Sequence, residues 1–399
     1  MTTTSDLSTA RGTTDWQAVA AGVALELAAD ALERDRAGQD PVSELRLLKD
    51  AGLITAGLPA ELGGGGAPWS VLLEIVRTIA TADGSVAQVL GYHYINVNEV
   101  LLTADEATIE RVLAASVAGR WVWGDAVNPI DPDLTVTRDG DGYILNGSKS
   151  FATGASVGDV TIVGAADPID GFHVGVYVPH DADGFGFKGD WDNLGQRLSA
   201  SGGVTFTDVR VTPGQVISRL DPERLSAYRT LVTPLIQAMF GYLYLGVAQG
   251  ALARAADYTR EQSRPWIFSG VARASEDPYV LQTYGVLAAR LQAVAALADS
   301  IGDRADTAVA RGSELTERER GEFATAVAAL KVVSTEVALE ISNRIFEVAG
   351  ARASANRFGF DIYWRNLRTH TLHDPVAYKQ REVGDFYLND RIPAFSLYT

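Results

Sequence analysis

The sequence contains no cysteine among its 399 residues. Without thiols the chain cannot form disulfides, thiolate zinc sites, iron–sulfur clusters or a cysteine nucleophile. Cations are also scarce, because 34 Lys and Arg are set against 50 Asp and Glu, which gives a net charge of −16. A surface of that sign binds nucleic acid and anionic lipid poorly. We therefore expect no nucleic-acid partner and no membrane partner.

Long hydrophobic runs are missing as well. No stretch approaches the roughly 20 uninterrupted apolar residues of a membrane helix. Residues 1–14 lack the apolar segment of a secretory signal, and their polar composition predicts a disordered tail. The composition as a whole, 47% hydrophobic and 21% charged, is that of a globular protein. We expect a cytoplasmic enzyme or binding protein.

Hydrophobic periodicity divides the remaining chain into three regions. Residues 15–120 have helical spacing, interrupted by a loop at the four glycines 63–66. Residues 121–225 alternate with period two, which predicts short strands in a small barrel or sandwich. Residues 226–399 return to helical spacing. The order predicts an α+β fold with an N-terminal helical domain, a central β domain and a C-terminal four-helix bundle.

Local signals predict where some elements begin and end. The residues Asp139–Gly142 predict the turn of a hairpin. Thr233 and Pro234 resemble an N-cap followed by proline, so we expect a long helix from there to about Ser263. The residues Thr316–Glu319 form a capping box that predicts the start of another long helix.

The segment WRNLRTHTLHDPVAYK, residues 364–379, holds an unusual density of reactive and charged side chains. His370 and His373 are three residues apart, so a helix would place them on one face. Two interpretations are open, half of a metal site or a pair of histidines with ordinary partners. No known zinc spacing accompanies them, and we predict no metal.

Several other candidates also have an ordinary structural explanation. His93 and Tyr92 lie in an aromatic helix that is typical of a core, and Trp191 could wall a pocket or fill a core. Arg260 and Arg264 follow a long helix, where cations complement the helix dipole or bind phosphate. Arg352 is a second phosphate candidate of the same kind.

Taken together, these segments resemble the acyl-CoA dehydrogenase family over nearly the whole chain. The segments that carry the resemblance are GLPAELGGGG, WVWGDA, GYILNGSKSFATGAS, GDWDNLG, YTREQSRPW, EDPYVLQTYG, GFDIYWRN and RTHTLHDPVAYK. The last segment is the most specific. The sequence is most similar to the flavin monooxygenases that share this fold, in particular the dibenzothiophene monooxygenases.

The resemblance implies a two-component monooxygenase that uses reduced FMN, supplied by a separate NAD(P)H:flavin reductase, and O2. In such enzymes a flavin C4a-hydroperoxide transfers oxygen to a heteroatom, here the sulfur of a small aromatic or heterocyclic substrate. It also implies a homotetramer. Family dehydrogenases need a carboxylate base, commonly a Glu, where this chain has His373 and Asp374.

The resemblance also implies roles for individual residues. It places His373 and Asp374 at the reactive edge of the flavin and Thr153 near flavin N5. Further residues are implied around them: Tyr92, His93 and Asp125 lining the pocket, Trp191 over the ring, Arg264 and Arg352 on the phosphate from a neighbouring subunit, and His370, Arg260 and Lys379 as weaker cofactor contacts.

Three alternatives stay open at this point: an amine or amino-sugar N-hydroxylase, an FAD-dependent acyl-CoA dehydrogenase, and a binding protein without flavin. Asp125 bears on the first, because an ionised carboxylate in an apolar pocket needs a partner and would attract an amine. The sequence does not give the exact substrate, the number of oxygens added, FMN or FAD preference, the reductase, or whether the Gly63–Gly66 loop is a lid.

Overall fold

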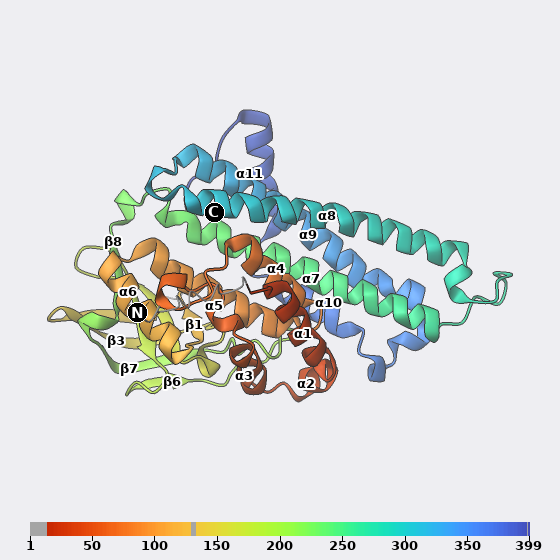
Figure 1. The fold of residues 1–399 in the computed structure, drawn as a ribbon, viewed down its shortest axis with the longest axis horizontal. Coiled ribbons are helices and arrows are strands. Elements are labelled where there is room, and N and C mark those ends of the chain that lie inside the picture. Colours follow the sequence, from red (N-terminus) through yellow and green to blue (C-terminus); the bar gives the residue numbers. More distant parts are fainter. Residues whose placement is uncertain (1–13, 129–132, 397) are drawn as a thin grey trace, which may run out of the picture.

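A computed structural model describes residues 14–128, 133–396 and 398–399 of the chain (Figure 1). The predicted disordered tail, residues 1–14, lies outside the described residues except for its last position. The N-terminal helices are α1 (Trp16–Ala28), α2 (Ala31–Ala37), α3 (Val42–Asp50), α4 (Trp69–Ala80), α5 (Gly84–Thr103) and α6 (Glu106–Gly119). Asp83 begins α5 by accepting hydrogen bonds from the backbone N–H groups of Ser85 and Val86.

The loop with four glycines is packed against its own neighbours. The N–H groups of Gly64, Gly65 and Gly66 donate to backbone carbonyls of residues 55–59. A Cβ on Gly64 would lie 2.2 Å from the carbonyl oxygen of Leu58, so only glycine fits there. These contacts favour a fixed turn over a lid.

The central domain is a sandwich of two four-stranded sheets. One sheet has the order β1-β4-β5-β8 and the other β2-β3-β7-β6, and β1 pairs with β4 in parallel. The described residues form no closed barrel. The strands are β1 (Trp123–Ala126), β2 (Leu134–Asp139), β3 (Gly142–Lys149), β4 (Val160–Ala166), β5 (His173–Pro179), β6 (Phe185–Phe187), β7 (Val204–Val211) and β8 (Val216–Leu220).

The predicted hairpin is present, with Asp139 paired to Gly142 across its turn. Gly140 in that turn has a φ of +61°, which glycine adopts without strain.

The C-terminal region is built on three long helices, α7 (Val232–Glu261), α8 (Pro278–Ala310) and α9 (Glu317–Ala349). The shorter helices α10 (Asp361–His370) and α11 (Val376–Asn389) complete the bundle. The capping box at Thr316 is confirmed. The predicted start of α7 is wrong, because a turn of 3-10 helix leads directly into the helix and places Thr233 and Pro234 inside its first turn.

One hydrophobic core joins the N-terminal helices to the bundle. Buried side chains of α4, α5, α7, α8 and α9 belong to the same cluster, and α5 also packs against β1. Helix α5 therefore lies where the three regions meet, with the sandwich at one end of the molecule and the long helices extending away from it (Figure 1).

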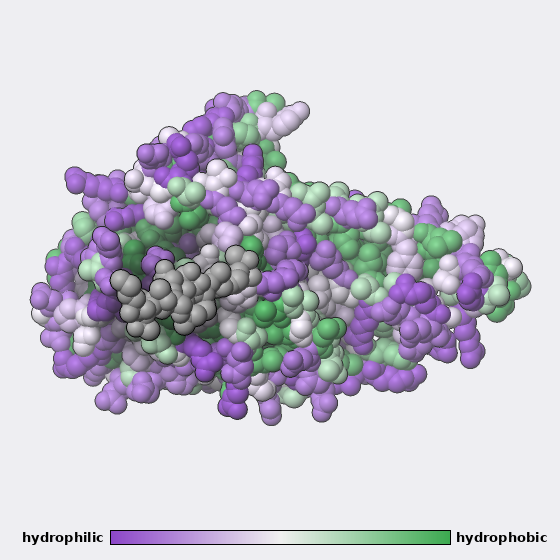
Figure 2. Space-filling model, in the orientation of Figure 1, coloured by the Kyte–Doolittle hydropathy of each residue, from purple (hydrophilic) through white to green (hydrophobic). Residues whose placement is uncertain are grey.

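Two helical stretches among the described residues, Arg229–Glu261 and α8, are long and apolar enough to cross a membrane. The first is 89% buried over its apolar window, as expected for the core helix of a bundle. Helix α8 is only 11% buried over its window, and Figure 2 shows pale to strong hydrophobic colouring along the surface that it forms. An apolar face of this kind fits a protein–protein contact.

Candidate active site

Helix α5 carries a line of polar side chains on one face, although almost all of the helix is buried. Ser85, Gln88, Tyr92 and Asn96 are spaced three or four residues apart, so they share a face. Gln88 donates to the hydroxyl of Thr153 over 3.3 Å. Gln88 Oε1 and Asn96 Oδ1 are buried without a partner among the described residues. Buried polar atoms in this state are rare, and a water molecule or a ligand atom can supply the missing partner.

The hydroxyl of Thr153 lies in a buried chain of hydroxyls. It lies 2.9 Å from the Ser201 hydroxyl, which is 2.8 Å from that of Ser199. The backbone around this chain is strained, because Phe151 and Ala200 have φ values of 55° and 47°. Non-glycine residues in this region concentrate at functional sites.

Trp191 stands beside this chain of hydroxyls. Its indole N–H donates to the carbonyl of Gln196 over 2.8 Å, and its ring meets the exposed ring of Phe151 edge-on at 6.2 Å. The segment that follows is fixed to two helices. Gln196 bonds through its side chain to the start of α5 and through its backbone N–H to Asn366 of α10. Trp191 and Thr153 are thereby held on one rigid support.

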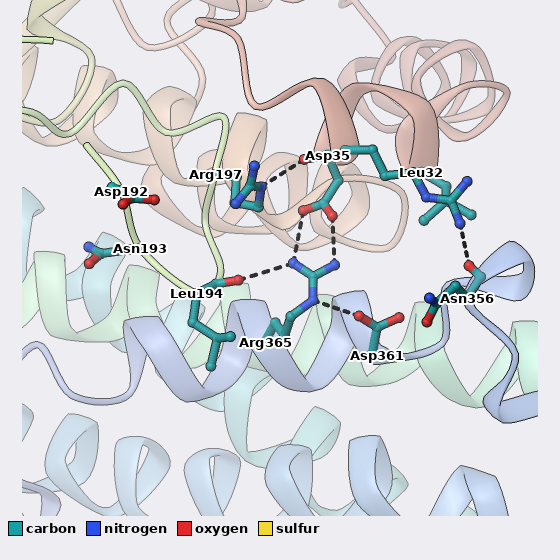
Figure 3. Close-up of a pocket in the computed structure, with 10 residues that line it drawn as sticks. Leu32, Asp35, Asp192, Asn193, Leu194, Arg197, Asn356, Asp361 and Arg365 are labelled. Atoms are coloured by element: carbon teal, nitrogen blue, oxygen red, sulfur yellow. Dashed lines mark hydrogen bonds and ion pairs between the residues drawn. The ribbon is translucent and has the colours of Figure 1, made fainter. Parts of the chain in front are cut away.

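An ion pair fixes α10 against the N-terminal helices (Figure 3). Arg365 of α10 donates twice to the buried carboxylate of Asp35 on α2, over 2.6 and 3.3 Å. It also donates to Asp361 and to the carbonyl of Leu194. These residues line a pocket of about 430 Å³, and neither His373 nor Thr153 lines it. The network positions α10, at whose end the two candidate histidines lie.

His370 and His373 are brought together with parallel rings, 6.0 Å between centroids. Both rings pack on Phe240 of α7, at 4.7 and 4.8 Å. His370 is buried, and the Tyr244 hydroxyl lies 2.9 Å from its Nδ1. Burial and the charges of His373 and Lys331 lower the pKa of His370 well below its usual value, so this ring is neutral.

The side chain of His373, which the resemblance places at the reactive edge of the flavin, is 37% exposed. Its Nδ1 lies 3.2 Å from Oδ1 of Asp374, and no described residue bonds to its Nε2. Asp374 is buried and also accepts from the ammonium group of Lys331. Burial alone would raise the pKa of Asp374, but the contacts with His373 and Lys331 outweigh it and lower that pKa.

Asp125 and Tyr92 lie close to this histidine group. Asp125 in β1 donates its backbone N–H to the carbonyl of Thr153 and accepts from the N–H of Val127. Burial raises the pKa of Asp125 to about 6, although the charge of His373 opposes the shift. Tyr92 packs on Phe240 at 6.1 Å, and burial raises its pKa well above the usual value, with Asp125 and Asp374 adding to the shift.

The expected catalytic role of His93 does not fit its surroundings. The ring is fully buried, its Nε2 bonds to the carbonyl of Ile54 over 2.7 Å, and its Nδ1 accepts from the N–H of Trp123. Burial lowers the pKa of His93 to about 4. With both nitrogens bonded to backbone, His93 fastens α5 to neighbouring segments and has no nitrogen free for a substrate.

Lys379 is another residue whose predicted ligand contact the structure does not favour. It is buried in α11, where its ammonium group donates to Glu382 and to the carbonyl of Tyr398. The donors that would bind a cofactor are therefore already engaged within the chain.

The three candidate arginines gather far from the histidines. Arg260 pairs with Asp257 in the last turn of α7, Arg352 donates to the carbonyl of Gln262 over 2.5 Å, and Arg264 is exposed without a partner among the described residues. Phe240 and Arg260 are twenty residues apart on one helix, which is about 30 Å. One copy of the chain therefore leaves these arginines far from His373.

Several polar residues that lie here were not predicted from the sequence, above all Gln88, Lys331 and Gln237. Each is a long polar side chain inside a helix whose neighbours are buried and apolar. That contrast was the available signal, since such residues are seldom fully buried without a partner. The described residues contain no group of three metal-ligating side chains.

Comparison with known proteins identifies three domain matches in order. They are the acyl-CoA dehydrogenase N-terminal domain at residues 16–120, middle domain at 126–209 and C-terminal domain at 238–377. The probable FMNH2-dependent monooxygenase SfnC of Pseudomonas putida is 40% identical over 385 residues, which cover 96% of this chain and 97% of SfnC.

Two solved structures superpose over almost the full length. Methanesulfinate monooxygenase MsuC from Pseudomonas fluorescens has a TM-score of 0.93 and 37% identity, covering 96% of this chain and 99% of MsuC. The dibenzothiophene monooxygenase TdsC from Paenibacillus sp. A11-2, in complex with FMN and indole, has a TM-score of 0.93 and 39% identity, with the same coverage.

Proposed function

The chain belongs to the acyl-CoA dehydrogenase family, and from that premise we propose that it is a flavin monooxygenase rather than a dehydrogenase. It uses reduced FMN and O2 to oxygenate the sulfur of a small aromatic or heterocyclic compound to the sulfoxide or sulfone. The names of SfnC, MsuC and TdsC support this function.

One observation in the site carries the choice between the two chemistries. A dehydrogenase of this family needs a free carboxylate that can accept a proton from carbon. Here the carboxylate of Asp374 is buried, and its Oδ1 is bonded to both Lys331 and His373. A carboxylate held ionised by two donors is a weak base. The imidazole of His373, whose Nε2 is free, is the group that faces outward.

The residues of the site fit a flavin. Trp191 and Phe151 offer flat apolar surface, and the hydroxyl of Thr153 lies beside them. The buried Oε1 of Gln88 and Nε2 of His370 lack partners among the described residues. Trp191, Thr153 and His370 would hold the ring system. Bound reduced FMN would supply the two electrons with which O2 is split, one oxygen atom going to the substrate and the other to water.

The chain's own residues then have separate tasks. His373 can take up a proton at Nε2 and return it, while Asp374 fixes the orientation of its ring through Nδ1. Phe240 and Tyr92 exclude water on the side of the bundle. Asp125 is the pocket residue whose protonation changes near pH 6, so it affects which substrates bind.

The assembly and the partners also belong to the proposal. A homotetramer would bring Arg264 and Arg352 of a second copy to the phosphate, which one copy cannot do. The exposed apolar face of α8 supports such an association. A separate NAD(P)H:flavin reductase would deliver the reduced FMN, and we expect both proteins in the cytoplasm.

The test combines the purified protein, a flavin reductase, NADH, FMN and dibenzothiophene or methanesulfinate. We expect an oxygenated sulfur product by chromatography. His373→Gln should reduce oxygen transfer by about 10²-fold or more, the usual range for loss of a general acid or base, while FMN still binds. The matched control is His180→Gln, because His180 is exposed in the β domain.

Product from an acyl-CoA with an artificial electron acceptor, and none from the sulfur compounds, would reject the monooxygenase. Hydroxylation of an amine, with no oxygenation of the sulfur compounds, would show that the enzyme oxygenates nitrogen and not sulfur. Full oxygen transfer by the His373 variant would remove that residue from the reaction.

A further inference from the structure

Lys331 is a fully buried cation in the middle of α9. Its ammonium group donates to Oε1 of Gln237 over 2.6 Å and to Oδ1 of Asp374, and it lies 5.2 Å from the centre of the Phe240 ring. These contacts occupy its donors among residues of α7 and of the turn after α10.

Stability alone explains this lysine poorly. Burying an ion pair costs several kcal/mol per ion, and a well-packed apolar pair of similar volume is often as stable or more so. On α9 its buried neighbours one turn away are the apolar Val327 and Ala328 on one side and the hydroxyl-bearing Ser334 and Thr335 on the other. A retained buried charge therefore calls for a further reason.

The reason lies in the atom that Lys331 contacts. Oδ1 of Asp374 accepts from both Lys331 and Nδ1 of His373. The three groups form a line from the core to the exposed side chain, in the order ammonium, carboxylate, imidazole. The exposed fractions of their side chains rise along it, from 0% for Lys331 to 6% for Asp374 and 37% for His373.

Other charged and titratable groups also act on Lys331. On α11, the charge of Lys379 lowers the pKa of Lys331 and the charge of Glu382 raises it. On α10, the charge of Lys331 in turn lowers the pKa of His370. Burial lowers the pKa of Lys331 to about 8, although Asp374 opposes that shift. Lys331 is thus largely protonated at neutral pH, when its charge cancels that of Asp374.

We propose that Lys331 is a positioning residue that sets the protonation state of His373. Its charge keeps Asp374 ionised as the acceptor for Nδ1–H, and it cancels the negative charge that would otherwise draw a second proton onto the imidazole. The Nδ1–H of His373 is thereby held on Asp374, and its Nε2 is left facing outward. The role in oxygen transfer rests on the proposed function, whereas the effect on His373 does not.

The test follows the protonation of His373 directly. Diethyl pyrocarbonate modifies neutral imidazole, so the rate of modification against pH, read by peptide mass spectrometry, gives a titration midpoint for each exposed histidine. In Lys331→Met the His373–Asp374 pair loses a compensating charge. We expect its midpoint to move to higher pH by about one unit, a tenfold gain in proton affinity.

Two further variants separate charge from packing. Lys331→Gln also removes the charge but keeps a polar group, so it should shift the midpoint in the same direction even if the Met variant does not fold. Lys331→Arg should restore the parent midpoint. The control is Thr335→Val, one turn along α9, because the Thr335 hydroxyl is buried without a partner among the described residues.

An unchanged midpoint in both neutral variants would overturn the proposal. A shift shared by exposed His180 or by the Thr335 variant would overturn it as well, since it would reflect general loosening. In the active enzyme, the acidic limb of kcat should move with the midpoint while KM stays near the parent value. The modification assay needs neither flavin nor substrate, so its outcome is independent of whether the protein oxygenates sulfur.

Discussion

The ion pair between Arg365 and Asp35 allows a quantitative prediction. Asp35 is 2% exposed, and its carboxylate accepts hydrogen bonds only from Arg365 among the described residues. Replacing Arg365 by Met leaves this carboxylate buried and unpaired. Breaking one side of a buried pair typically costs about 3–5 kcal/mol, so we expect a loss of that size in the free energy of unfolding.

The matched control is Arg318→Met. Arg318 also makes two ion pairs, with Glu322 and Asp390, but all three side chains are 45% exposed or more. Exposed pairs contribute about 0–1 kcal/mol. The two variants remove the same side chain, so the difference in stability between them measures the effect of burial.

Urea unfolding followed by tryptophan fluorescence and circular dichroism would measure both variants. The double variant Asp35→Asn/Arg365→Met should recover part of the loss, because no charge is then left buried. A loss for Arg365→Met no larger than that for Arg318→Met would refute the reasoning. Since α10 ends at the candidate histidines, we also expect Arg365→Met to lower oxygen transfer.

Three other predictions address the site and the assembly. Burial raises the folded-state pKa of Asp125 to about 6, so this residue lowers the stability of the native protein as pH rises from about 4 to 6. Asp125→Asn should therefore have a higher melting temperature than the parent at pH 7.5 but not at pH 4. Arg264→Ala and Arg352→Ala should weaken FMN binding measured by fluorescence titration, and unchanged affinity would exclude these arginines from the phosphate site. The control is Arg260→Ala, because Arg260 already pairs with Asp257. Ala289→Arg on the exposed face of α8 should shift the mass measured by light scattering toward smaller species, and an unaltered mass would exclude this face from the proposed tetramer interface.

Much of the architecture could be read locally along the chain. The hairpin turn at Asp139–Gly142 and the capping box at Thr316 are fixed by residues within a few positions of one another, and both are confirmed. The predicted start of α7 was wrong because the turn before it packs into the core, and no local signal at Thr233 indicates that packing.

The candidate site divides in the same way. The pairing of His373 with Asp374 is between neighbours in the chain, so the sequence alone could suggest it. The roles of His93 and Lys331 depend on Ile54, Gln237 and other partners far away in the sequence. A histidine in an aromatic helical segment gives the same sequence pattern whether its ring nitrogens bond to backbone groups or to a substrate.

Composition and periodicity therefore determined the order of the three regions and the residue types available for chemistry. Those properties follow from short-range rules of helix and strand formation. The tertiary structure alone decided which of these residues meet, which are tied to backbone, and which charge lies behind His373. Such contacts depend on how distant segments pack, and the free energy of a buried charge depends on every group around it.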